Sequence, residues 1–344
     1  MKKVLWIFLA ISVLLTGVVF ASTFRDQRNK FREEIDLKVA DQMDKAGLYS
    51  SVTFKNEKAW DFKVSPDEKT KIKANLKSYF NTSDDQLLEK MVTEVNRGRY
   101  VIFEEFPPNG DGVNLKCAFL SPKVPYWKPL TDIQNIEDLF YVYNFSVLLG
   151  NKGPNDNYVV LATEGKFMGF GKSVVLPLYF HADQPNRVLS FREATQKEAT
   201  EMANALPVLK PGRTSVQDRF IDLCRTYPWF QDKDGSGNYV VSDKDILEIM
   251  DKTIINKDKE CDVYESTGGW KIYEDVSDNY YLVNYSLKSV VNIQAFIPPN
   301  VPLLGSMFKK VAQSVSDEVS AKYLPLSMKN FRDKTVEWAK SPPQ

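Results

Sequence analysis

The sharpest chemical pattern in the chain is a run of oxygen-bearing residues between positions 232 and 243. These residues fall at positions one, three, five, seven and twelve of a calcium loop of the EF-hand type, and Gly237 stands at its sharp turn. Position twelve is an aspartate where the longer glutamate is usual, and Tyr239 replaces an aliphatic residue. The alternative interpretation is a solvated Asp/Gly turn. The predicted calcium ligands are Asp232, Asp234, Ser236, Asn238 and Asp243.

Other patterns that would carry chemistry are weaker. The segment 165–173 mimics a phosphate loop, but Lys166 stands where glycine is needed and a strand pattern follows instead of a helix. A hairpin turn, in which the glycines relieve backbone strain, explains the segment better. His181 is the only histidine, so a catalytic triad or histidine metal site would depend on it alone, and a surface role is favoured. Adjacent carboxylates such as Glu104 and Glu105 point to opposite faces of a strand. The sequence therefore favours a non-catalytic protein over a hydrolase.

Composition limits the class of partner. Lys plus Arg and Asp plus Glu are both 45, so the chain has no electrostatic reason to bind nucleic acid. An apolar content of 43% predicts a packed core. The three cysteines, Cys117, Cys224 and Cys261, leave at least one thiol unpaired. A Cys224–Cys261 disulfide and three buried free thiols are both consistent with the sequence.

The N-terminus predicts export. Lys2 and Lys3 precede an apolar run without charge from Val4 to Ala21. Residues 1–21 are therefore a signal peptide or, if retained, a membrane anchor long enough to span a bilayer. We expect a periplasmic or extracellular protein, with membrane contact through the N-terminus in the second case. Residues 22–48 show helical spacing of apolar side chains and predict an amphipathic helix.

A weak self-similarity suggests two related halves. Residues 83–91 resemble 242–250 as helix starts, 98–105 resemble 268–275 as strands, and 191–193 resemble 331–333 inside helices, in the same order. The alternative is that amphipathic helices and hairpins look alike. This pattern predicts two α+β domains, 49–206 and 207–344. The further elements expected are strands 141–149, 157–164 and 173–180 with helix 190–205, then strands 261–266, 269–276, 280–288 and 290–297 with helices 306–322 and 327–340.

The C-terminal pattern leads to a resemblance. Phe308, Val311 and Val315 share one helix face that must cover apolar surface, for which a curved antiparallel sheet is the natural partner. Together with the segments 269–271, 280–285, 297–307 and 324–332, this arrangement resembles the end of a START-like lipid-binding domain with a helix-grip fold. The predicted fold is thus α+β, with a curved antiparallel sheet, a helix pair and a long C-terminal helix, in one or two tandem copies.

The resemblance implies a tunnel between the sheet and the final helix that holds an apolar small molecule or lipid. The functional expectation is an exported, non-catalytic envelope protein that binds such a ligand. The alternative is an envelope interaction or structural protein with a filled core and no ligand, stabilised by calcium.

Overall fold

The computed structural model describes residues 37–54, 57, 60–105, 112–131, 145–153, 155–167, 170–195, 198, 232–233, 239–240, 263–291, 325–337 and 339–340. Its labelled helices are α3 (Pro66–Phe80), α4 (Asp85–Asn96) and α5 (Trp127–Thr131), and residues 325–337 form a further helix, called the C-terminal helix below. The strands are β1 (Leu37–Gln42), β2 (Tyr49–Phe54), β3 (Tyr100–Glu105), β4 (Gly112–Pro122), β5 (Phe145–Gly153), β6 (Asp156–Phe167), β7 (Phe170–Asp183), β8 (Val188–Glu193), β9 (Asp232–Lys233), β10 (Tyr239–Val240), β11 (Val263–Tyr273) and β12 (Tyr280–Val291).

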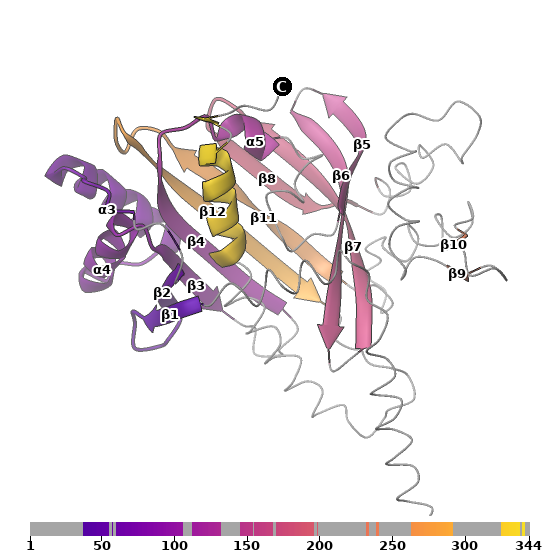
Figure 1. The fold of residues 1–344 in the computed structure, drawn as a ribbon, viewed down its shortest axis with the longest axis horizontal. Helices are drawn as coiled ribbons and strands as arrows, with labels where there is room; N and C mark the ends of the chain where they lie inside the picture. Colours follow the sequence, from indigo (N-terminus) through magenta and orange to yellow (C-terminus); the bar gives the residue numbers. More distant parts are fainter. Residues whose placement is uncertain are drawn as a thin grey trace, which may run out of the picture.

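One curved antiparallel sheet organises the described residues (Figure 1). Its ten strands follow the order β1-β2-β3-β4-β12-β11-β8-β7-β6-β5, so β11 and β12 lie in its middle. β12 pairs with β4 from Tyr280 opposite Pro122 to Val290 opposite Gly112, and β11 pairs with β8. The centre of the sheet is therefore built by hydrogen bonds between distant parts of the chain.

This strand order corrects the predicted division into domains 49–206 and 207–344. Strands from both sides of that boundary share one sheet, because β11 and β12 are hydrogen-bonded between β4 and β8. The helix pair comes from the first half and the C-terminal helix from the second. The two predicted copies are therefore complementary parts of one helix-grip arrangement.

The helix pair begins where the sequence provides caps. Ser65 and Glu68 form a capping box, in which the Ser65 hydroxyl accepts from the Glu68 amide at 3.3 Å and the Glu68 carboxylate accepts from the Ser65 amide at 2.6 Å. α4 is capped by Asp84, whose carboxylate accepts from the Leu87 amide at 3.0 Å. The predicted helix pair and the predicted helix start at 83–91 are confirmed.

Two apolar layers lie on opposite faces of the sheet. Along β3, Tyr100 and Ile102 join one layer while Val101 joins the other, as the two-residue repeat of a strand requires. The helix-pair layer, under α3 and α4, consists of Met43, Phe62, Ile72, Leu76, Phe80, Leu87, Leu88, Met91, Val92, Val95, Val101, Ala118, Leu120, Val276 and Leu282. The C-terminal layer, under the C-terminal helix, consists of Val52, Phe54, Tyr100, Ile102, Leu115, Cys117, Phe119, Tyr126, Leu130, Val159, Leu178, Phe180, Ala182, Leu189, Phe191, Trp270, Ile272, Val283, Tyr285, Leu326, Met328 and Phe331.

Two predicted helices are wrong over part of the residues that can be compared, although Glu198 of the second is helical. Residues 37–42 of the predicted helix 22–48 form β1, which pairs with β2, and the part before residue 37 lies outside the described residues. Residues 190–193 of the predicted helix 190–205 belong to β8. In β8, Leu189 and Phe191 are buried and alternate with polar side chains, so the period-two signal of a strand was present.

The hairpins and the last helix agree better with expectation. β3 and β4 pair as predicted, β5, β6 and β7 overlap the three expected strands, and β11 covers two of them as one strand. The C-terminal helix confirms most of predicted helix 327–340. The face formed by Phe308, Val311 and Val315, and strand 290–297 beyond residue 291, lie outside the described residues.

Candidate ligand-binding site

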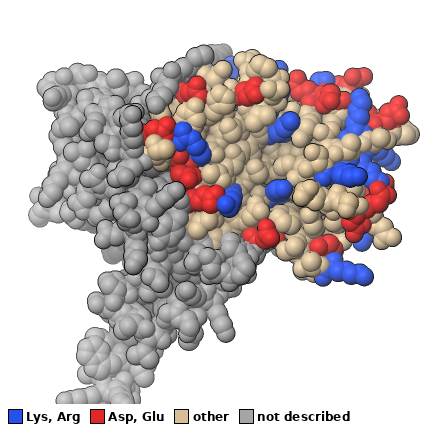
Figure 2. All heavy atoms as spheres, turned by 180° about the vertical axis from the view of Figure 1, so that it is seen from behind, with Lys and Arg blue, Asp and Glu red and all other residues tan. Residues whose placement is uncertain are grey.

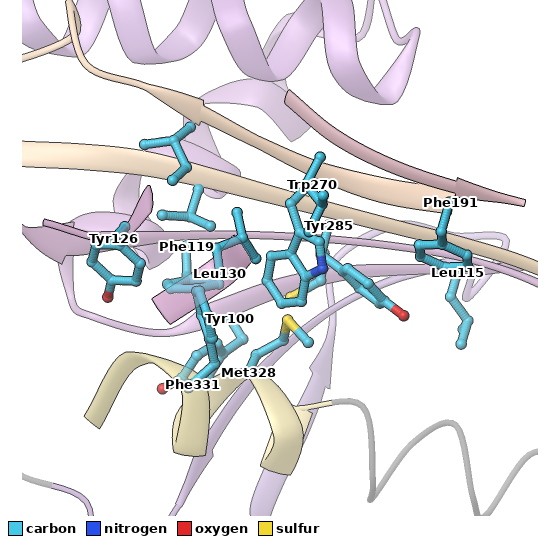
Figure 3. Close-up of a cluster of buried hydrophobic side chains, with 14 of the residues drawn as sticks. Tyr100, Leu115, Phe119, Tyr126, Leu130, Phe191, Trp270, Tyr285, Met328 and Phe331 are labelled. Atoms are coloured by element: carbon cyan, nitrogen blue, oxygen red, sulfur yellow. The ribbon is translucent and has the colours of Figure 1, made fainter. Parts of the chain in front are cut away.

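The C-terminal layer is rich in aromatic rings that converge beneath the C-terminal helix (Figure 3). Phe331 lies against both Trp270 and Tyr126, with ring centroids 4.6 and 5.2 Å apart. Trp270 also contacts Tyr285 at 4.4 Å. Rings of this size supply large apolar contact area, and the tilted pairs are a favourable geometry. This layer is where an apolar ligand would find matching surface.

Helical spacing explains which side chains of the C-terminal helix face the sheet. Met328, Phe331, Arg332 and Thr335 follow one another at intervals of three and four residues, so they share one face. All four are fully buried. The helix thus presents two apolar side chains, one arginine and one hydroxyl to the sheet.

Arg332 is a charged residue inside this apolar layer. Its side chain is 0% exposed, and that of Glu57 only 6%. Arg332 Nη1 donates to the carbonyl oxygens of Gly98 at 3.0 Å and Leu120 at 3.1 Å, and Nη2 donates to Glu57 Oε1. The Tyr100 hydroxyl donates to the same Glu57 oxygen at 2.8 Å. These bonds tie the middle of the C-terminal helix to the β3 and β4 side of the sheet.

Aromatic rings surround the guanidinium of Arg332. Its central carbon lies 4.5 Å from the ring centroid of Tyr100, 5.4 Å from that of Trp60 and 5.7 Å from that of Phe119. Such cation–π contacts are stronger when the pair is shielded from water. The sequence analysis missed Arg332 as a site residue, although an arginine on the apolar face of a predicted helix was a usable signal.

Burial also keeps the weak acids of this layer neutral. It raises the pKa of the Tyr100 hydroxyl well above its ordinary value. It likewise raises the pKa of the Tyr126 hydroxyl and of the Cys117 thiol. The layer therefore carries one positive and one negative group, Arg332 and Glu57, among otherwise neutral side chains.

The layer extends past the end of the C-terminal helix. Figure 3 shows Leu115 and Phe191 beyond the Met328 end of that helix. Phe191 packs on Phe180, with centroids 5.5 Å apart, and lies opposite Gly268. A Cβ on Gly268 would come within 2.1 Å of the Ser286 carbonyl oxygen and 2.8 Å of the Phe191 ring, so the glycine in β11 makes room both for the backbone of β12 and for this aromatic ring.

The predicted calcium loop is only partly described. Asp232–Lys233 pairs with Tyr239–Val240 as a two-stranded ladder, which brings the ends of the loop together. The predicted ligands Asp234, Ser236, Asn238 and Asp243 lie outside the described residues. No cluster of three or more metal-ligating His, Cys, Asp or Glu side chains occurs among the residues that are described. Calcium binding stays a prediction.

The remaining residues singled out in the sequence form a hairpin turn, an exposed histidine and a buried thiol. The phosphate-loop mimic is a hairpin, with Phe167 opposite Phe170 at the β6–β7 turn, as the sequence indicated. His181 is exposed on β7, 2.8 Å from Asp156 Oδ1, as its predicted surface role requires. Cys117 is a buried free thiol in the C-terminal layer, whereas Cys224 and Cys261 lie outside the described residues.

The face opposite the view of Figure 1 carries mixed charges (Figure 2). Lys and Arg are interspersed there with Asp and Glu, in agreement with the balanced composition. Within the described part of the chain no helix has the length and apolar character to cross a bilayer. Residues 1–21, the predicted signal peptide or anchor, lie outside that part.

Comparisons with known proteins concern the fold. No family model and no curated protein matches the sequence. Human STARD10 is similar in structure, with a TM-score of 0.39 and 9% identity over 75% of this chain and 82% of that one. A fragment of a STAR-related lipid transfer protein from Xanthomonas axonopodis has a TM-score of 0.35 and 11% identity over 69% and 93% of the two chains. The Zhui aromatase/cyclase of a Streptomyces species has a TM-score of 0.37 and 8% identity over 66% and 96%.

These TM-scores are all below 0.5, and the fold assignment rests on the described residues of this chain. The described residues themselves show a curved antiparallel sheet with a helix pair on one face and a C-terminal helix on the other. This is the arrangement that the sequence predicted: a curved antiparallel sheet with a helix pair and a C-terminal helix.

Proposed function

We propose that this protein binds an apolar ligand, such as a lipid, between the curved sheet and its C-terminal helix. This proposal rests mainly on the aromatic layer, which begins under the helix and continues beyond its Met328 end to Leu115 and Phe191. Such a layer gives a hydrocarbon chain contact on several sides, and ligand sites of this kind are mostly apolar with few polar groups.

The proposed role is non-catalytic. The two charged side chains of the layer, Arg332 and Glu57, are bonded to each other and to Gly98, Leu120 and Tyr100. Groups held in this way position the helix and are not free to exchange protons with a substrate. We further propose export, with residues 1–21 as a signal peptide or anchor. Intact-mass measurement of the protein from its native membrane and soluble fractions tests this, because cleavage after Ala21 removes a defined mass.

A structural or interaction protein without ligand is the second candidate, stabilised by calcium at the loop 232–243. The ring contacts of Phe331 with Trp270 and Tyr126 favour it, since they fill the part of the layer beneath the helix. A melting shift on adding calcium, reversed by a chelator, tests the calcium part of that role. An unchanged melting temperature would end it.

The binding proposal is tested by what accompanies the protein through purification. Protein prepared without detergent is extracted with organic solvent, and the extract is analysed by mass spectrometry. Met328→Phe, which enlarges a side chain of the C-terminal layer, should lower the amount of lipid recovered. Met91→Phe is the matched control, because Met91 is equally buried but belongs to the helix-pair layer.

Both variants overpack a core and should lose similar stability, about 1–3 kcal/mol. Only Met328→Phe should change the recovered lipid. Absence of any lipid from the wild-type protein, together with failure to take up added lipid, would reject the binding function in favour of the filled-core candidate.

A further inference from the structure

Three buried polar atoms on the C-terminal helix have no hydrogen-bond partner among the described residues: Ser327 Oγ, Arg332 Nε and Thr335 Oγ1. Two of them, Arg332 Nε and Thr335 Oγ1, belong to side chains that are 0% exposed. Buried polar groups are nearly always bonded, so an unpaired pair in one place calls for an external partner. Thr335 would ordinarily satisfy its hydroxyl through the carbonyl one turn earlier, but it does not do so here.

The two atoms belong to one place in the fold. Residues 332 and 335 are three positions apart on a helix, which brings their side chains together on one face. That face also carries Phe331 and Met328, which together with Leu326 are the helix's contribution to the C-terminal layer. The rings of Tyr100 and Phe119, which flank Arg332, belong to the same layer. The polar pair thus adjoins the apolar surface proposed for the ligand.

Charge narrows the chemistry of a partner. Arg332 is already paired with the carboxylate of Glu57, and its Nη1 is bonded to two carbonyls. A second anion here would leave one buried negative charge uncompensated, which is strongly unfavourable. A neutral oxygen has no such cost, because it accepts from Arg332 Nε and exchanges a hydrogen bond with the Thr335 hydroxyl.

We propose that Arg332 and Thr335 form the polar end of the ligand site and hold a neutral oxygen, such as the hydroxyl of a long-chain alcohol or a sterol. This inference rests on the proposed function and names its ligand class: an uncharged amphipathic lipid whose oxygen docks at the helix and whose apolar body lies along Trp270 and Tyr285.

The test compares three probes of equal chain length: 1-hexadecanol, hexadecane and palmitate, radiolabelled and presented to the full chain from phosphatidylcholine vesicles. The wild-type protein should bind the alcohol about tenfold more tightly than the hydrocarbon, as one buried hydrogen bond provides, and more tightly than the anionic palmitate. Thr335→Val, which keeps the side-chain shape, removes one of the two proposed partners and should reduce the preference for the alcohol while leaving hexadecane binding unchanged.

Thr93→Val is the control, because Thr93 lies exposed on α4 and its hydroxyl donates to the Glu89 carbonyl at 2.8 Å. It should leave all three affinities as in the wild type. Equal binding of alcohol and hydrocarbon, tighter binding of palmitate, or an alcohol preference that Thr335→Val does not reduce would overturn the polar site while leaving apolar binding standing. Absence of binding for all three probes would instead reject the proposed function itself.

Discussion

The helix-pair layer and the C-terminal layer pack against opposite faces of the same strands, but they bury different chemistry. The first is mostly aliphatic, and its one buried charge, Glu94, is paired with Arg97 and Arg99, which reach it from the surface. The second has nine aromatic residues among its 22 buried members, against two among 15 in the first, and it encloses Arg332 completely, with Glu57 as its buried partner. One face of the sheet therefore mainly holds the fold together, whereas the other combines packing with specific polar contacts.

The largest expected effect comes from breaking the buried pair. Arg332→Met should destabilise the protein by about 3–5 kcal/mol, because it leaves the Glu57 carboxylate uncompensated. Glu94→Gln, on the other face, should cost about 1 kcal/mol, since the arginines it releases can be hydrated. Urea denaturation of both variants measures the difference.

A double variant sharpens this result. Arg332→Met combined with Glu57→Gln removes the uncompensated charge and should recover part of the lost stability. A double variant as unstable as Arg332→Met plus the separate cost of Glu57→Gln would show that the two groups are not coupled.

The next effect separates packing from binding. Leu76→Ala and Met328→Ala each empty a fully buried position and should cost about 2–5 kcal/mol. Added 1-hexadecanol should raise the melting temperature of Leu76→Ala as much as that of the wild type, because binding stabilises the folded state by mass action. The increase in melting temperature on adding 1-hexadecanol should be different for Met328→Ala. Equal increments in both variants would place the ligand elsewhere than in the C-terminal layer.

A smaller effect is the alkaline behaviour of Cys117. Burial raises the pKa of its thiol in the folded state, so the unfolded chain gives up this proton first. The associated stability is complete below the unfolded thiol's pKa of about 8.5 and declines above it, by up to about 1.4 kcal/mol per pH unit. Denaturation midpoints measured from about pH 7 to about pH 10 should fall less steeply for Cys117→Val than for the wild type. Parallel profiles would contradict a buried thiol in this layer.

The smallest effect belongs to the helix pair. Ser65→Ala removes the hydroxyl half of the capping box that starts α3 and should cost about 1 kcal/mol. Hydrogen exchange should report faster opening of the first turn of α3, with the C-terminal layer and ligand uptake unchanged. An unaltered exchange pattern would mean that the cap does not hold this turn.

The sequence predicted the elements of the two layers unequally. α3 and α4 could be predicted from the sequence because their caps and periodicity are local signals, as at Asp84. The pairing of β12 with β4 could not be predicted, because it joins residues far apart in the chain and leaves no local sequence signal. The same local patterns in both halves therefore suggested two domains where the hydrogen bonds build one sheet.

The residues of the site, too, could be predicted only where the signal was local in the sequence. Trp270 and the last helix were recognised as parts of a helix-grip fold from their own segments. Arg332 was not recognised as a site residue, because its partners Glu57, Gly98 and Leu120 come from β2, β3 and β4 regions that only the fold brings together. The edge strand β1 and the inner strand β8 were mistaken for helical segments, because short alternating patterns competed with longer helical ones.

The most direct measurement of the central claim is photo-crosslinking with a long-chain alcohol that carries a diazirine in its chain, followed by peptide mapping. Binding between the sheet and the C-terminal helix predicts label on peptides that contain Trp270, Tyr285 and Met328. Label concentrated on α3 and α4 around Leu76 and Met91, or spread evenly along the chain, would contradict it.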